Sequence, residues 1–135
     1  MIHVIDTDGD HAAWTFSADP GTVRAARGAV RDQLRIWDLD DIVDLAALLV
    51  SELVTNALRY ATDPIGVRLT RPTDLGGILL VEVSDPLPEP PHERVARPED
   101  EGGRGLQLLA SASRRWGTRP GTVGKTVWFE LAVPR

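Results

Sequence analysis

The strongest constraint on the fold is a long helical pattern that begins near Asp40 and ends with the segment SELVTNALRYA at residues 51–61. Its apolar residues recur at helical spacing on one broad face, which consists of Ile42, Val43, Ala46, Leu49, Val50, Leu53, Val54, Ala57 and Tyr60. Only a narrow sector around Asp44, Ser51 and Thr55 is polar enough to face water. We therefore predict a mostly buried helix around which the rest of the chain is organised.

Two polar residues lie at the border of this apolar face. Glu52 and Asn56 are four residues apart, so they lie one above the other on the helix. A carboxylate and an amide at such a border need partners, because burying an unpaired charge is costly. A bound cation would supply one partner. The alternative is a solvated or self-paired Glu and Asn at a helix edge.

Two later segments favour the cation. The run LLVEVSDP at residues 79–86 is rich in β-formers and ends abruptly in Asp85 and a proline. The segment EGGRGLQLL at residues 101–109 is a glycine cluster that leads directly into a helical pattern. Glycines before a helix N-terminus let backbone N–H groups approach an anion closely, and the helix dipole favours negative charge there. Together the two segments indicate a phosphate site.

The order of these motifs resembles the GHKL-type ATP-binding domain, the histidine kinase-like Bergerat fold. The phrases SELVTNALRYA, EGGRGLQLL and GKTVWFEL are most similar to the anti-sigma factor serine/threonine kinases and their actinobacterial relatives, and the resemblance covers about residues 19–131. It implies an α/β fold, a two-layer sandwich in which a mixed, largely antiparallel sheet carries helices on one face. It also implies ATP and Mg²⁺ as cofactors.

The resemblance assigns roles to three side chains. Glu52 would orient or deprotonate the attacking hydroxyl, which makes it the catalytic residue. Asn56 would hold Mg²⁺ through its side-chain oxygen, a hard ligand that suits a hard cation already bound to phosphates. Asp85 would accept a hydrogen bond from the adenine amino group.

Four further positions complete the ATP site that the resemblance implies. The backbone around Gly103 and Gly105 would cradle the phosphates. Arg104 would be a charge partner for them, and Thr126 would neighbour the adenine site.

In the family branch that the chain resembles, the domain phosphorylates a serine or threonine of a small antagonist (anti-anti-sigma) protein, sequesters a sigma factor, or does both. The resemblance thus implies a transcription regulator with these partners, and a homodimer by analogy. The alternative is a degenerate nucleotide-binding module that acts by protein sequestration without catalysis. Intact Glu52 favours the kinase, whereas Pro86, Leu87 and Pro88 favour the module, because they stand where the family commonly has glycines.

Length and composition bound the domain organisation. The 135 residues suffice for one domain, which we place at residues 11–135 after a short N-terminal arm at 1–10. The proline-rich segment at about 86–102 has little to bury, and the family has its ATP lid there; a merely disordered loop is the alternative.

No apolar run approaches the roughly 18 residues of a membrane helix, and no signal peptide is evident, so we expect a cytoplasmic protein without a membrane partner.

The net charge and the number of cysteines and histidines exclude some classes of function. The net charge of −5 argues against direct nucleic-acid binding, which demands a basic face. The chain has no cysteine, and His3, His11 and His92 show no ligand spacing, so any metal here takes oxygen ligands.

A row of arginines is the one local exception to the acidic balance. Arg24, Arg27, Arg31 and Arg35 recur every three or four residues and line one face of the first helix. The row is either a solvated helix surface or a docking face for an acidic partner protein.

The remaining segments give the other elements of the expected fold. We predict a strand over residues 11–18 at a sheet edge, and a helix to about Trp37 that Asp19 caps and Pro20 begins. The later elements are antiparallel strands at 65–70 and 78–84, a helix at 103–112, a turn after residues 114–117 and a last strand at 125–133.

Overall fold

The computed structural model describes the backbone of residues 2–7, 9–60, 64–72, 77–86, 101–121 and 124–134. In chain order, the elements of this part are β1 (Ile2–Thr7), β2 (His11–Phe16), α1 (Thr22–Ile36), the 3-10 turn η1 (Asp40–Ile42), α2 (Val43–Tyr60), β3 (Ile65–Thr70), β4 (Ile78–Asp85), α3 (Glu101–Ala112), β5 (Arg115–Pro120) and β6 (Lys125–Ala132). Most of the ATP lid expected at 86–102, namely residues 87–100, lies outside the described residues.

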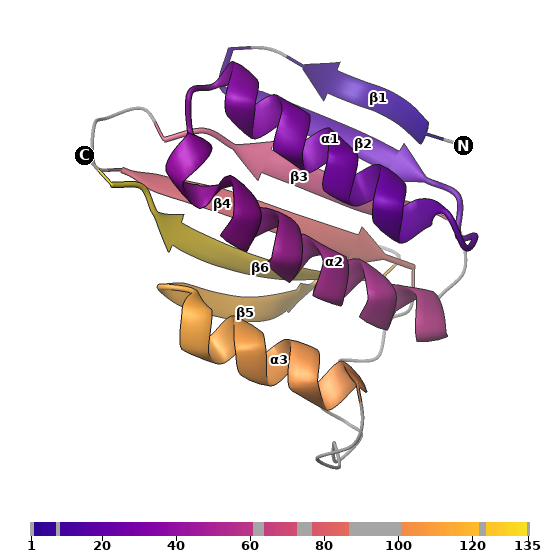
Figure 1. Cartoon of the computed structure of the whole chain (residues 1–135). Coiled ribbons are helices and arrows are strands. Elements are labelled where there is room, and N and C mark those ends of the chain that lie inside the picture. The colour runs from indigo at the N-terminus through magenta and orange to yellow at the C-terminus, as the bar shows by residue number, and fades with distance from the viewer. Residues whose placement is uncertain are drawn as a thin grey trace.

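The six strands form one sheet in the order β1-β2-β3-β4-β6-β5. Each neighbouring pair is antiparallel, including the predicted β3–β4 pair. Figure 1 shows α1, α2 and α3 side by side on one face of this sheet. The predicted α/β sandwich is confirmed, and the described strands pair antiparallel throughout.

The core lies between the helices and the inner face of the sheet. Along β2, β3, β4 and β6 every second residue is buried, as the pleat of a strand with one covered face requires. The inward residues include Trp14, Phe16, Ile65, Val67, Leu69, Leu79, Val81, Val83, Val127, Phe129 and Leu131. Two of the inward positions carry charged residues. Asp85 is the last residue of β4, and Lys125 is the first residue of β6.

The central helix α2 is buried as its sequence predicts. It lies between α1 and α3 and contacts both of them, together with β4 (Figure 1). The predicted beginning near Asp40 appears as η1, which leads directly into α2. Its buried residues include Val43, Ala46, Ala47, Leu49, Val50, Leu53, Val54 and Ala57.

Helix α1 begins slightly later than predicted, at Thr22 instead of Pro20. The Asp19 carboxylate accepts a hydrogen bond from the Gly21 N–H at 2.8 Å, and the Thr22 hydroxyl accepts one from the Asp19 N–H at 3.1 Å. A side chain that bonds the backbone two residues on forms a turn of its own. This turn delays the helix, whose N-cap is Gly21 without a side-chain cap hydrogen bond, so the predicted cap by Asp19 was wrong.

Two predictions about the sheet were wrong. The strand predicted at an edge is β2, which lies between β1 and β3, because part of the expected N-terminal arm forms β1. The residues expected to lead into a turn at 114–117 mostly belong to β5. Strand β5 lies at a sheet edge and is exposed or half-buried along its length, so it shows no buried alternation in the sequence.

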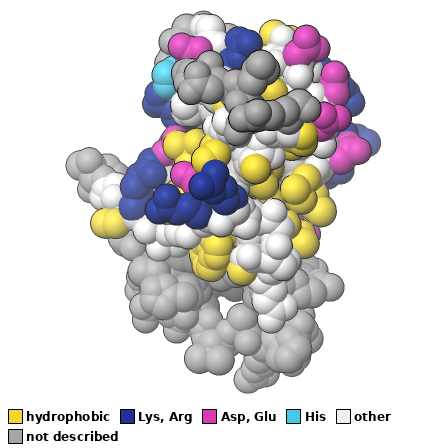
Figure 2. All heavy atoms as spheres, turned by 90° about the vertical axis from the view of Figure 1, so that its left-hand side faces the viewer, with side chains coloured by type: hydrophobic (Ala, Val, Ile, Leu, Met, Phe, Trp, Pro, Cys, Tyr) yellow, Lys and Arg dark blue, Asp and Glu magenta, His cyan; other side chains and the backbone are white. Residues whose placement is uncertain are grey.

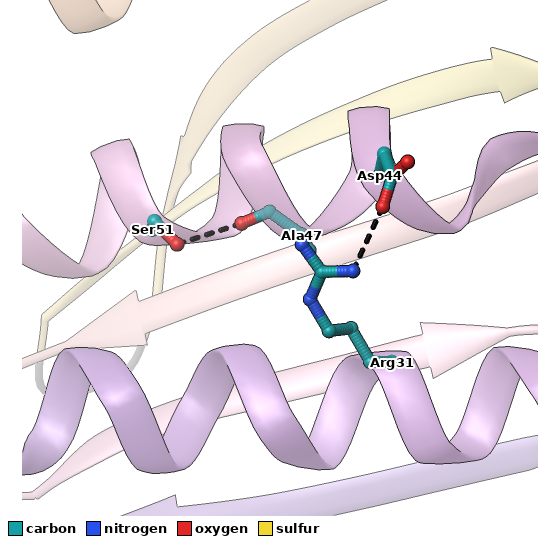
Figure 3. A network of polar contacts seen from close by, with 4 residues as sticks. All are labelled: Arg31, Asp44, Ala47 and Ser51. Atoms are coloured by element: carbon teal, nitrogen blue, oxygen red, sulfur yellow. Dashed lines mark hydrogen bonds and ion pairs between the residues drawn. The ribbon is translucent and has the colours of Figure 1, made fainter.

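An ion pair joins α1 and α2 at the surface (Figure 3). Arg31 Nη1 lies 2.8 Å from Asp44 Oδ1, and the Ser51 hydroxyl donates to the Ala47 carbonyl at 2.7 Å. The Asp44 side chain is 91% exposed, so the pair contributes about 1 kcal/mol at most. The arginine row is therefore split, since Arg31 turns toward α2 while Arg24, Arg27 and Arg35 are exposed.

The surface at the left-hand end of Figure 1 carries charges of both signs. Figure 2 shows a band of Lys and Arg side chains across the middle of this end and acidic side chains along its upper right margin. Within the described part of the chain, the exposed large hydrophobic residues are Ile36, Leu48 and Trp116. None of the described helices is long and apolar enough to cross a membrane.

Candidate functional site

The segments that carry the predicted site residues meet at one end of the sandwich. In Figure 1 the C-terminal half of α2, the end of β4, the beginning of α3 and the beginning of β6 all lie at the right-hand end. Helix α2 contacts both α3 and β4, and β4 pairs with β6 along its whole length. The topology thus brings together four segments that are far apart in the sequence.

Asp85 ends β4 as a buried carboxylate. It continues the inward phase of Leu79, Val81 and Val83, and its register partner on β6 is Lys125. Lys125 Nζ lies 3.1 Å from each carboxylate oxygen, with side chains that are 9% exposed for Lys125 and 5% for Asp85. Because an unpaired buried charge is costly, this ion pair lets both side chains occupy inward positions.

The neighbouring residues of both strands point to the other face of the sheet. Ser84 and Thr126 are also register partners, and their hydroxyl oxygens lie 2.9 Å apart. Successive side chains of a strand point to opposite faces. Thr126 therefore lies on the outer face of the sheet, whereas Asp85 and Lys125 lie on the inner face.

Gly124 lies where the backbone that enters β6 passes close to the end of β4. A side-chain carbon at Gly124 would overlap the Asp85 carbonyl oxygen and lie 2.7 Å from Pro86 Cα. The Gly124 carbonyl also accepts a hydrogen bond from the Gly121 N–H at 2.7 Å. The chain entering β6 thus passes so close to the end of β4 that only glycine fits.

We expect Gly124→Ala to lower the free energy of unfolding by about 1–3 kcal/mol, because backbone atoms, not a flexible side chain, must move to admit the methyl group. Denaturant unfolding followed by circular dichroism measures this change. Gly28→Ala is the matched control, since Gly28 lies within α1 and has open space around it. That control should raise stability by about 1 kcal/mol. Equal effects of the two substitutions would contradict the close approach at Gly124.

Glu52 and Asn56 are half-buried on α2, one turn apart as predicted. Helix geometry turns the chain by about 100° per residue, which carries both side chains away from the flank where Asp44 pairs with α1. Helix α3 lies on the other side of α2 from α1 (Figure 1). We infer that Glu52 and Asn56 line the side of α2 that borders α3.

The oxygen donors on α2 fit a magnesium ion that also binds phosphates. Carboxylate and amide oxygens are hard ligands, and Mg²⁺ commonly takes one or two protein ligands and fills its other positions with phosphate oxygens and water. Within the described residues, no group of three or more His, Asp or Glu side chains is placed to hold a metal by itself. Asn56 and Glu52 each carry side-chain oxygens of the kind that could take one of these ligand positions.

The glycine cluster lies inside α3, which begins at Glu101, two residues before the predicted position. Gly103 belongs to the first turn, whose N–H groups have no partner within the helix, whereas the Gly105 N–H can bond to the Glu101 carbonyl. The side chain of Arg104 lies outside the described part of the structure. The first turn of α3 can therefore offer backbone N–H groups to an anion at the same end as Asp85.

Lys125 and Gly124 lie at the candidate site, and neither was predicted there. A signal for Lys125 was present, because it precedes Val127, Phe129 and Leu131 in the inward phase of β6. A charged residue in phase with a buried face requires a partner. Which partner it has follows from the β4–β6 register, and the sequence does not reveal that register.

Comparisons with known proteins identify the family and a similar fold. The family model described as the histidine kinase-like ATPase domain matches residues 16–131. A solved structure of the histidine kinase domain from the Erythrobacter litoralis EL346 blue-light activated histidine kinase is similar, with a TM-score of 0.52 and 20% sequence identity. The similarity covers 82% of this chain and 61% of that one, so the chain spans about three fifths of its length, and at this identity it concerns the fold alone. No curated protein matches the sequence.

Proposed function

The chain belongs to the histidine kinase-like ATPase domain family, and we propose on this ground that it binds ATP where α2, β4, α3 and β6 meet. The observation that carries the proposal is the buried Asp85 carboxylate at the inward end of β4. A carboxylate fixed in this way accepts hydrogen bonds only, which suits the exocyclic amino group of adenine. The first turn of α3, at the same end of the sandwich, is the proposed phosphate site.

Asn56 is the proposed magnesium ligand. Its amide oxygen on the α3 side of α2 would hold the ion against the phosphates that the N-terminal turn of α3 binds. A bound Mg²⁺ would compensate negative charge on the phosphates. Gly103 would contribute its backbone N–H, and Arg104 is the proposed charge partner.

Glu52 is the proposed catalytic residue of a protein kinase. It lies one turn before Asn56, where it would orient or deprotonate the hydroxyl of a serine or threonine. Phosphoryl transfer requires mainly positioning and charge compensation from the protein. By the likeness of the three motifs to anti-sigma factor kinases, the proposed acceptor is a small antagonist protein, and a sigma factor is the second proposed partner.

Glu52→Gln separates binding from transfer. We expect the variant to bind Mg²⁺-ATP as the wild type does and to lose phosphoryl transfer by about 100-fold or more, in line with the loss of a positioned base. The assay supplies γ-labelled ATP with heat-inactivated extract of the source cell and follows labelled protein bands. A band of equal strength with both proteins would contradict the role of Glu52.

A binding module without catalysis is the second candidate. It is favoured by the buried Lys125, which already occupies the oxygens of Asp85, and by Pro86 directly after Asp85. A protein that binds Mg²⁺-ATP but labels no protein in the extract would support this candidate over the kinase.

A further inference from the structure

A cavity of about 460 Å³ lies between helix α1 and strand β2 and shares no residue with the proposed ATP site. Trp14 of β2 forms one wall, and Arg24 lines the cavity near the beginning of α1. The flank of α1 supplies the remaining lining residues, Ala25, Gly28, Ala29, Asp32, Gln33 and Ile36. Arg31, which pairs with α2, is not among them, and Figure 1 shows α1 as the described helix nearest to β1. The cavity therefore lies on the side of α1 away from α2.

Gln33 is a buried polar side chain that lines this cavity without a partner. It is only 7% exposed, and among the described residues its side chain has no hydrogen bond. The amide is not sealed inside the protein, because in the described part of the chain Glu130 Oε1 is the one fully covered side-chain atom without a partner. Polar groups that are mostly buried usually have hydrogen-bond partners, since an unmade bond costs free energy. The Gln33 amide is therefore placed to bond a group that enters the cavity.

The rest of the cavity suits an apolar side chain. Ala25, Gly28 and Ala29 are small and neighbour one another at helical spacing, so a chain that docks on α1 can approach it closely. A side-chain carbon placed at Gly28 would meet nothing within 4 Å. Trp14 and Ile36 add apolar surface, and Ile36 is 75% exposed. An apolar side chain that enters here would remove this surface from water.

The charges around the cavity favour an acidic partner. Arg24, Arg27 and Arg35 of α1 are exposed, and none of them forms an ion pair with a described residue. They outnumber Asp32, the acidic residue of the lining. A second copy of this chain would bring two arginine-rich faces together, and such like-charge contacts are unfavourable. An acidic chain would instead compensate the arginines.

We propose that the flank of α1 and Trp14 form a docking groove for an acidic segment of a partner protein. A carboxylate of this segment pairs with Arg24, an apolar side chain enters the cavity, and a polar group bonds the Gln33 amide. Of the two interpretations of the arginine row, this is the docking face. The contact involves neither ATP nor Mg²⁺, so the inference goes beyond the proposed function and stands or fails independently of it.

A synthetic peptide tests the groove. The probe has about 15 residues, enough to form a helix, with leucines at helical spacing and glutamates at most other positions. Titrated into isotope-labelled protein, it should give saturable shifts of the Gln33 side-chain amide and Trp14 indole N–H signals. We expect a dissociation constant of about 0.01–1 mM, as a few buried side chains provide. A peptide with lysine in place of glutamate should bind at least about tenfold more weakly. No shift of the two signals with the glutamate peptide would overturn the inference.

Arg24→Glu and Arg27→Glu are a matched pair of variants, because each reverses one exposed arginine of α1 but only Arg24 lines the cavity. Arg24→Glu should weaken binding of the glutamate peptide by about tenfold or more, and Arg27→Glu by less than about threefold. Equal losses would mean that the peptide responds only to the total charge, which would overturn the groove. Shifts of the Gln33 and Trp14 signals when the protein is concentrated without peptide would show that a second copy occupies the groove, and would overturn the acidic partner.

Discussion

Asp85→Ala should lower the free energy of unfolding by about 3–5 kcal/mol, because Lys125 then loses the carboxylate that lies 3.1 Å from it in a buried corner. Net stabilities of domains are only about 5–15 kcal/mol, so the loss is a large fraction of the total. Lys125→Met should be comparably destabilising, since it leaves the buried carboxylate without the ammonium group. Chemical denaturation followed by circular dichroism measures both changes.

The double variant Asp85→Ala/Lys125→Met supplies the critical comparison. It removes both charges, so it should be less destabilised than the sum of the two single variants by more than about 1 kcal/mol. The exposed Arg31–Asp44 pair is the matched control, and Asp44→Ala should change stability by less than about 1 kcal/mol (Figure 3). Additive effects at Asp85 and Lys125 would contradict an energetically coupled buried pair.

Asn56→Ala should weaken Mg²⁺-ATP binding by about 100-fold or more while the protein stays folded. Outer-shell partners of metal ligands are already worth about 10–100-fold in metal affinity, and Asn56 is proposed as a direct ligand. The side chain is half-buried and belongs to no core cluster, so its loss should leave the thermal midpoint nearly unchanged.

Thr55→Ala is the matched control for Asn56→Ala. Thr55 is also half-buried on α2, but about 100° of helix rotation places it on another flank. This control should bind Mg²⁺-ATP with wild-type affinity. A folded Asn56→Ala variant with unchanged nucleotide affinity would refute the assignment of Asn56.

The interior of the fold was predictable because buried elements have apolar residues at regular spacing in the sequence. Helix α2 and strands β3, β4 and β6 lie close to their predicted positions, since each alternates or repeats apolar residues at the period of its own geometry. Strand β5 was missed because it lies at an edge and shows no such spacing, with Gly117 inside it and Pro120 at its end.

The candidate site was only partly predictable for a different reason. Glu52 and Asn56 share one helix, so their mutual placement follows from their spacing alone. The Asp85–Lys125 pair depends on the register between β4 and β6, which is set by contacts across 40 residues of chain. A shift of one residue exchanges the two faces of the sheet, so the sequence alone does not show that Lys125, and not Thr126, lies on the face of Asp85.

Isothermal titration of the purified wild-type chain with ATP, with and without Mg²⁺, tests the central claim most directly. We predict saturable binding to one site per chain, tighter with Mg²⁺ than without it, and ADP titrated in parallel shows what the γ-phosphate contributes. A folded protein that gives no binding signal with ATP, with Mg²⁺ or without it, would contradict the nucleotide site at Asp85 and Asn56.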